Sequence, residues 1–158
     1  MSLMPPEERL LKALLDKGLT LSIAESCTGG LLANRITNIP GSSKVFLLGI
    51  IAYANSAKYR LLKIPEKTIR NYGAVSSPTA RLMAEGARRL GGSDLGIGLT
   101  GIAGPGGGNK SKPVGTVFIA VSSSRKTLVK KFHFRGSRLR IKKQAADKAI
   151  QMLLEAIK

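Results

Sequence analysis

A short segment near the start of the chain combines residue types that nucleophilic catalysis uses. A serine, a cysteine and a threonine are followed by two glycines at residues 26–30. An apolar run at residues 19–24 predicts a buried strand before it, and the apolar spacing of residues 31–36 predicts a helix after it. The first N–H groups of a helix are unpaired and can hold an anion or an oxyanion, while glycines let a ligand approach the backbone. For this segment taken alone, an ordinary helix cap by Ser26 or Thr28 remains the simpler alternative.

A serine nucleophile needs a base, and lysine is the candidate that this chain offers. The one histidine, His133, lies between two phenylalanines in a strand pattern, so a Ser-His-Asp triad is not expected. Lysine is the usual substitute, and Lys58 follows the second predicted strand, at the end of the sheet where Ser26 is expected. A lysine acts as a base only if burial or a cationic neighbour lowers its pKa. Spacing alone does not separate such a lysine from a solvated one.

Cys27 competes with Ser26 as the nucleophile, because a thiol is intrinsically more reactive than a hydroxyl. A cysteine amidase normally has an adjacent base such as histidine, and His133 is poorly placed for that role. Adjacent side chains at a turn also diverge, and a lone cysteine is often buried. We therefore expect Ser26 to face the ligand and Cys27 to pack inward.

Metal and cofactor sites are not predicted. With one histidine and one cysteine, the chain has no Cys-x-x-Cys and no His pair of the kind that binds zinc. The glycine-rich segment at residues 101–108 lacks the Gly-Lys-Ser/Thr of a phosphate-binding P-loop, and no Gly-x-Gly-x-x-Gly follows the first strand. We expect no cofactor. The two glycine-rich turns either line one pocket together or are unrelated tight turns.

The rest of the sequence alternates between helical and strand patterns. Helices are predicted at residues 7–17, 31–38, 55–62, 65–71, 77–90 and 137–158, and strands at 19–24, 46–53, 94–100, 116–122 and 127–134. The second of these strands is expected to be buried. The order predicts an α/β protein with one domain, residues 1–158, folded as a three-layer α/β/α sandwich on a mixed, mostly parallel sheet of about five strands.

The composition is strongly basic. Lys and Arg number 26 against 9 Asp and Glu, which gives a formal net charge of +17. Such a charge attracts nucleic acids or small anions. With no Trp, three Tyr and four Phe, the chain has few side chains for stacking on bases, so we expect no specific nucleic-acid site. A solvated lysine-rich surface is the simplest explanation of the charge, followed by an anionic substrate.

The sequence also predicts a soluble cytoplasmic protein. A lone cysteine cannot form an internal disulfide, which suits a reducing compartment. Residues 1–8 lack the basic-then-apolar order of a signal peptide. The longest apolar run, residues 45–54, is too short to cross a bilayer, so no membrane partner is expected.

Four segments, in order along nearly the whole chain, carry a family resemblance. They are Ala24-Glu25-Ser26-Cys27-Thr28-Gly29-Gly30, Tyr53-Ala54-Asn55-Ser56-Ala57-Lys58, Gly73-Ala74-Val75-Ser76, and residues 100–107 with 112–117. Together they resemble the C-terminal domain of the competence/damage-inducible protein CinA, a domain that also occurs as a free-standing protein. Phe134-Arg135-Gly136-Ser137-Arg138 is similar to the family's Phe-x-Gly-x-Arg segment. Larger members carry a further N-terminal nucleotide-hydrolysing domain, whose activity we do not expect here.

This resemblance implies an amidohydrolase that converts nicotinamide mononucleotide (NMN) and water to nicotinate mononucleotide and ammonia. By position, Ser26 is the implied nucleophile and Lys58 the general base, with Tyr53 beside them. The implied oxyanion turn is formed by Thr28, Gly29 and Gly30. The implied substrate contacts are Thr100, Gly101, Gly104, Gly106 and Arg138, of which the arginine suits the phosphate.

The expected partners are a small pyridine nucleotide as substrate and a second copy of the chain in a homodimer. Two other classes of function remain open from the sequence. One is a basic nucleic-acid-binding protein linked to competence or DNA damage, and the other is a catalytically inactive domain that keeps the ligand pocket.

Overall fold

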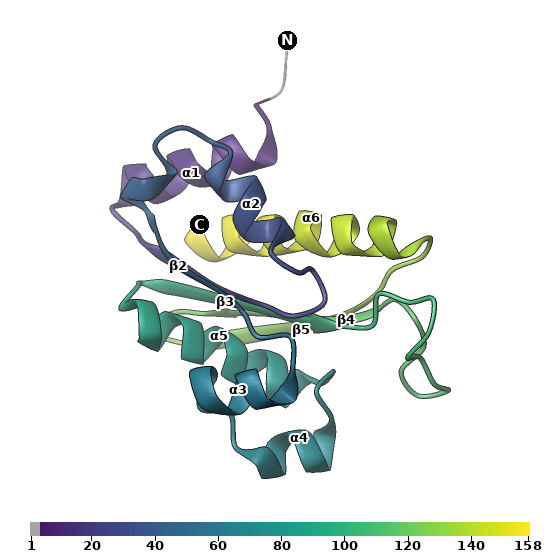
Figure 1. Cartoon of the computed structure of the whole chain (residues 1–158). Helices are drawn as coiled ribbons and strands as arrows, with labels where there is room; N and C mark the ends of the chain where they lie inside the picture. Colours follow the sequence, from purple (N-terminus) through teal and green to yellow (C-terminus); the bar gives the residue numbers. More distant parts are fainter. Residues whose placement is uncertain (1–3) are drawn as a thin grey trace.

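One five-stranded sheet separates two helical layers in the computed structural model, which describes residues 4–158 (Figure 1). Residues 1–3, part of the segment in which no signal peptide is expected, lie outside the described residues. The strands lie in the order β2 (Phe46–Ile51), β1 (Leu21–Glu25), β3 (Leu95–Gly101), β4 (Thr116–Ser122) and β5 (Thr127–His133). β1 is parallel to β2 and to β3, whereas β4 is antiparallel to β3 and to β5. Four strands therefore run in one direction, which confirms the predicted mixed sheet.

The helices cover both faces of this sheet. One face carries α1 (Pro6–Lys17), α2 (Leu31–Thr37) and α6 (Arg138–Ile157), and the other carries α3 (Asn55–Leu62), α4 (Glu66–Tyr72) and α5 (Ser77–Gly91), as Figure 1 shows. A short 3-10 turn, Ser42–Lys44, leads into β2. This arrangement is the predicted α/β/α sandwich. None of the helices in residues 4–158 combines the length and the apolar character that crossing a membrane requires.

Helix ends follow the local sequence closely. α1 stops at Gly18, whose left-handed backbone (φ 62°) returns N–H donors to the last turn of the helix. α5 begins after Ser76, whose hydroxyl accepts a hydrogen bond from Thr79 N, with Pro78 in the first turn. Ser137 caps α6 in the same way. These residues fix where each helix meets the sheet.

The central strand β3 is packed so closely by α5 that side chains are excluded. A Cβ atom on Gly96 would lie 2.2 Å from Ala84 O, and one on Gly98 would lie 2.6 Å from Ala84 N. Any larger residue would push α5 away from the sheet. This contact holds α5 directly against β3.

β2 departs from the sequence expectation. It was predicted to be buried, yet its residues alternate between half-buried and exposed, with Leu47 and Ile51 about half exposed. The reason is its place at the edge of the sheet beside the short helix α2, which leaves part of one face uncovered. An apolar run identifies a strand but not its position in the sheet.

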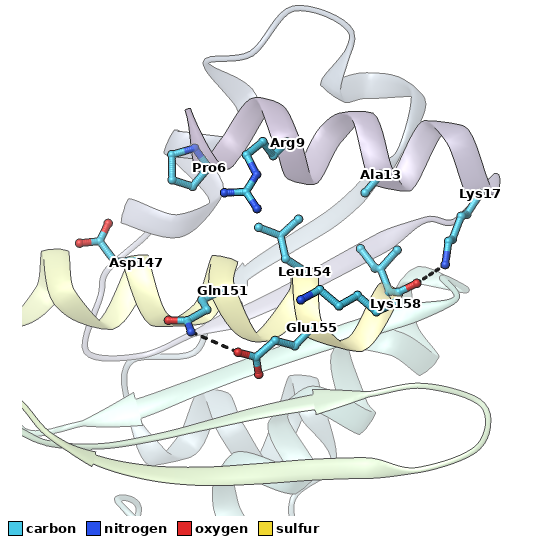
Figure 2. A pocket seen from close by; sticks show the side chains of 10 residues that line it. Pro6, Arg9, Ala13, Lys17, Asp147, Gln151, Leu154, Glu155 and Lys158 are labelled. Carbon is cyan, nitrogen blue, oxygen red and sulfur yellow. Dashed lines mark hydrogen bonds between the residues drawn. The ribbon is translucent and has the colours of Figure 1, made fainter. Parts of the chain in front are cut away.

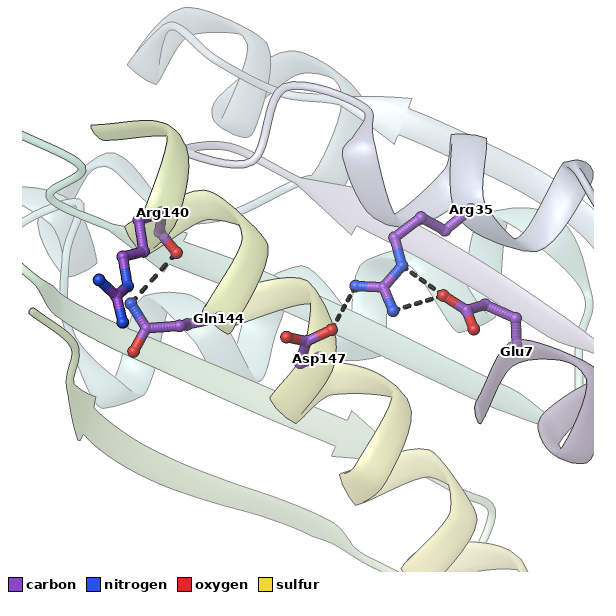
Figure 3. Close-up of polar contacts among 5 residues, drawn as sticks. All are labelled: Glu7, Arg35, Arg140, Gln144 and Asp147. Carbon is purple, nitrogen blue, oxygen red and sulfur yellow. Dashed lines mark hydrogen bonds and ion pairs between the residues drawn. The ribbon is translucent and has the colours of Figure 1, made fainter. Parts of the chain in front are cut away.

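An ionic contact ties the helices α1, α2 and α6 together (Figure 3). Arg35 of α2 pairs with Glu7 of α1 and, at 2.7 Å, with Asp147 of α6. The arginine side chain is largely covered, so the pair with Glu7 is shielded from solvent. The contact fixes α2 relative to both neighbouring helices.

Candidate active site

The carboxyl ends of three neighbouring parallel strands meet at one pocket. Ser26 follows β1, Lys58 lies in α3 just after β2, and the glycine-rich segment at residues 101–108 leaves β3. The chain leaves β1 toward one face of the sheet and β2 toward the other, which is where ligand crevices form in α/β proteins. The pocket has a volume of about 290 Å³. Among the predicted residues, Ser26, Tyr53, Lys58, Thr100, Gly101, Gly104, Gly106 and Arg138 line it.

Ser26 and Lys58 are in direct contact inside this pocket. Lys58 Nζ lies 3.0 Å from Ser26 Oγ, and it also donates to Ala52 O at 2.8 Å and to Tyr53 O at 3.0 Å. When Lys58 is protonated, its three N–H groups meet these three acceptors. When it is neutral, the two carbonyls take both N–H groups and the nitrogen lone pair faces the Ser26 hydroxyl. The arrangement therefore fits a serine paired with a lysine base.

Burial favours the neutral form of Lys58, which is the form that can act as a base. The side chain is only 1 % exposed and forms no ion pair with a carboxylate of residues 4–158. Desolvation lowers the pKa of Lys58 from its ordinary value, with a weaker opposing effect from Cys27. A larger fraction of neutral amine is therefore available at a given pH than on a solvated lysine.

The turn after Ser26 is arranged differently from the expectation. Gly29 N donates to Ser26 O at 3.1 Å, and Gly30 N donates to Glu25 Oε2 at 3.1 Å, so neither N–H is free to hold an oxyanion. Thr28 is fully buried and lies outside the pocket lining. The part of the predicted oxyanion turn that depends on Gly29 and Gly30 is corrected, because internal acceptors already occupy these two amides. The Thr28 amide has no such acceptor among residues 4–158, and its role stays a prediction.

Cys27 lines the pocket but is a poor thiolate. Its side chain is buried, and desolvation, reinforced by the nearby Glu25 charge, raises the pKa of Cys27 to about 11. Its backbone N–H donates to no backbone acceptor within residues 4–158. Cys27 can thus offer its backbone to a ligand while its thiol stays protonated.

A polar bridge forms the rim of the pocket. Arg138 Nη1 donates to Gly104 O at 2.7 Å, and Arg138 Nη2 donates to the Tyr53 hydroxyl at 3.0 Å. The guanidinium has further N–H groups beyond these two. An anionic group of a ligand at the rim would meet a cation that is already held in place.

Thr100 is positioned as an acceptor. Its hydroxyl is buried and donates to Ala74 O at 2.7 Å, which leaves only oxygen lone pairs for a ligand. This bond also holds the loop before α5 against the end of β3. The sequence placed Thr100 in the pocket lining but could not show which way its proton points.

Two other features lie outside the site. His133 is exposed at the end of β5, where Nε2 contacts Val114 O at 3.1 Å, and it does not line the pocket. A second hollow, of about 610 Å³, lies between α1 and α6 (Figure 2). Gln151 bonds to Glu155 there, and the described residues that line it include no paired nucleophile and base.

Sequence reasoning missed several contributors to the site, among them Ile102 and Ala103 of the pocket lining. Asn55 and Val75 line the pocket although no role was expected for them. Glu25 was quoted only as part of a motif, yet its buried carboxylate organises the turn that carries Ser26. A glutamate at the end of an apolar strand, next to a helix without acidic residues in its first turn, was the available signal.

The fold and this site define a family, and the sequence comparison agrees with them. Residues 4–157 match the family model of the CinA C-terminal domain, and the chain belongs to this family. A CinA-like protein of Syntrophus aciditrophicus is 54 % identical over 141 residues, which cover 89 % of this chain and 34 % of that protein. A putative competence-damage inducible protein of Caldicellulosiruptor bescii is 48 % identical over 151 residues, which cover 96 % of this chain and 37 % of that protein. The chain therefore spans about a third of the length of these relatives.

A solved structure also matches throughout. The crystal structure of competence/damage inducible protein CihA from Agrobacterium tumefaciens superimposes with a TM-score of 0.95 at 37 % identity, and it covers 100 % of both chains. The predicted family membership and fold are confirmed by these matches.

Proposed function

We propose that this protein is an amidohydrolase that converts NMN and water to nicotinate mononucleotide and ammonia. The observation that carries the proposal is the buried Lys58 Nζ, 3.0 Å from Ser26 Oγ and held by two carbonyl oxygens. A serine and a base in this geometry support acyl transfer. The identity of the substrate rests on the family resemblance and on the cationic rim of the pocket.

In the first half of the reaction, neutral Lys58 takes the Ser26 proton as Oγ attacks the carboxamide carbon. The C–N bond then breaks as protonated Lys58 returns the proton to the leaving nitrogen, which departs as ammonia. Ser26 is left as an ester of the nicotinate group. The carbonyls of Ala52 and Tyr53 keep the Lys58 nitrogen aimed at this position throughout.

The oxyanion needs donors other than those of the two glycines. In a strand-to-helix turn, the N–H after the nucleophile is the usual choice, and here it belongs to Cys27. Ala103 and Gly104 also line the pocket, and their backbone N–H groups have no acceptor in the described part of the chain. We assign stabilisation of the developing charge to these groups.

In the second half, water replaces ammonia. Lys58 takes a proton from the water as its oxygen attacks the ester, and the proton passes to Ser26 as the acid leaves. The phosphate of the nucleotide would lie at Arg138, whose remaining N–H groups suit a phosphate oxygen. The pyridine ring would contact the apolar side chains of Val75 and Ile102, which line the pocket.

The test is ammonia release from NMN by the purified protein, with the nucleotide product identified by mass spectrometry. We expect wild-type protein to release ammonia and Ser26→Ala to release none. Ser56→Ala, which changes an exposed serine beside the site, is the matched control and keeps its activity. Wild-type protein that yields no nicotinate mononucleotide would contradict the proposed reaction.

The net charge of +17 favours nucleic-acid binding as the second candidate function. If the positive charge attracts nucleic acid only through its long-range electrostatic field, binding to a DNA duplex is weak, independent of sequence and steeply reduced by salt. A titration of a labelled duplex at increasing salt measures this. A sequence-preferring complex that survives physiological salt would favour the second candidate.

A further inference from the structure

Glu25 fills the start of the helix that follows the nucleophile. Its side chain is 1 % exposed, and Oε1 accepts from Ala33 N at 2.8 Å. Oε2 accepts from Gly30 N at 3.1 Å and from Leu32 N at 3.2 Å. Three of the N–H groups that a helix start normally leaves unpaired are therefore taken by one carboxylate from the preceding strand.

These bonds span the segment that carries Ser26. The Ser26 backbone is anchored on one side, where its N–H donates to Leu99 O of β3 at 3.1 Å. On the other side, the Glu25 carboxylate binds the N–H groups at the start of α2. It takes the place of a capping side chain, which Gly30 cannot provide. A single buried side chain thus closes the turn between β1 and α2.

We propose that Glu25 is a positioning residue, which holds the turn so that Ser26 Oγ meets Lys58 and which keeps ligand anions out of the start of α2. The inference rests on the proposed function in that Ser26 is taken as the nucleophile. It goes further by assigning the N–H groups at the start of α2 to an internal side chain instead of to a ligand. Substrate anions are then directed to Arg138 and the glycine-rich loop, outside the reach of Glu25.

The variant Glu25→Gln tests the role with little change in shape. One oxygen becomes an NH₂ group and faces a backbone N–H, so two donors confront each other and the turn relaxes. Because a displacement of about 1 Å can lower a rate by ~100-fold, we expect kcat to fall by that order. KM stays within about twofold of wild type, because the rim contacts of Arg138 are unchanged. A merely structural role would lower the amount of folded protein without this split.

Chemical rescue separates positioning from folding. Glu25→Ala removes the carboxylate and leaves three orphan N–H groups around a small hole, and added formate should occupy it and raise kcat in proportion to its binding. Glu25→Leu fills the hole and should not respond to formate. Asp94→Ala is the matched control: Asp94 also accepts from a backbone N–H, that of Thr20 at 2.8 Å, but at the opposite end of the strands. Its kcat should equal that of wild type.

A second readout does not need the substrate. The rate at which a fluorophosphonate labels Ser26, followed by mass spectrometry, should fall in Glu25→Gln and recover with formate in Glu25→Ala. If wild type labels at Ser26 but does not hydrolyse NMN, the proposed reaction fails while the positioning role stands on the labelling rates. If Glu25→Gln labels and turns over like wild type, the positioning role is overturned. Wild type that neither labels at Ser26 nor turns over would overturn both.

Discussion

Arg138 and Tyr53, which are 85 residues apart in the chain, meet at the rim of the pocket, where Arg138 Nη2 donates to the Tyr53 hydroxyl at 3.0 Å. The same guanidinium donates to Gly104 O at 2.7 Å. One side chain at the start of α6 therefore joins the segments that follow β2 and β3. The hydroxyl proton of Tyr53 remains available to a ligand, since its oxygen acts as the acceptor in this contact.

Arg138→Ala should weaken substrate binding more than it slows chemistry. Loss of a charge-assisted contact with the phosphate is worth roughly 1.5–3 kcal/mol, so we expect KM for NMN to rise about 10- to 100-fold. Steady-state kinetics measures the change. Arg140→Ala, two residues further along α6 and exposed, is the control and should leave KM unchanged. An unchanged KM in Arg138→Ala would make Arg138 a surface residue without a substrate role.

Ser26→Ala and Lys58→Ala should each lower kcat by a factor of about 10³ or more, and the double variant should be no worse than either. The reason is that the two side chains form one unit, with 3.0 Å between Nζ and Oγ. Lys67→Ala, an exposed lysine of α4, serves as the control. Additive losses in the double variant would show that the two residues act independently.

Cys27→Ala should keep most of the activity. The thiol is buried and its pKa is raised to about 11, so it is a poor nucleophile, whereas its backbone N–H is retained in the variant. We expect a loss of about 1 kcal/mol in the free energy of unfolding from the missing packing. Rapid inactivation of wild type by a thiol-alkylating reagent, together with turnover by Ser26→Ala, would reverse the assignment of the nucleophile.

Activity and stability should both rise with pH through the titration of Lys58. The base must be neutral to accept the Ser26 proton, so kcat/KM increases as Lys58 loses its proton, below the ordinary lysine value of 10.5. Because burial lowers the pKa of Lys58 in the folded state, the unfolded chain binds more protons in that window, and the free energy of unfolding increases with pH.

Denaturant unfolding of wild type and Lys58→Met checks this linkage. The measurement should stay between neutral pH and pH 9, because above 9.0, the ordinary value for Cys27, its raised pKa acts with the opposite sign. The slope should be smaller in Lys58→Met. Equal slopes in the two proteins would contradict the role of Lys58.

The sequence was sufficient to place Ser26 and Lys58 together at one end of the sheet. Ser26 and Lys58 each follow a strand, and the carboxyl ends of parallel neighbours coincide, so their meeting follows from topology. Sequence patterns also predicted the helix ends at Gly18 and Ser137, because those residues act on their own turn.

The free and occupied N–H groups of the site could not be predicted in the same way. Whether Gly30 N is available depends on how far the Glu25 side chain reaches, and the direction of the Thr100 hydroxyl depends on a loop 26 residues away. The exposure of β2 likewise depends on its place at the edge of the sheet, which the local sequence does not reveal. Each of these features depends on contacts between distant segments rather than on local pattern.

The position of α6 has a consequence for synthesis on the ribosome. Ser26 and Lys58 lie in the first part of the chain, and all five strands are complete at His133, yet one face of the sheet is covered by residues of α6 such as Ile141, Ala149 and Leu153. A nascent chain that has reached β5 would already carry Ser26 and Lys58 while exposing that apolar face, a state prone to aggregation. Its Arg35 would also lack Asp147. The helix that follows β5, α6, is therefore the one that covers this face and stabilises the site.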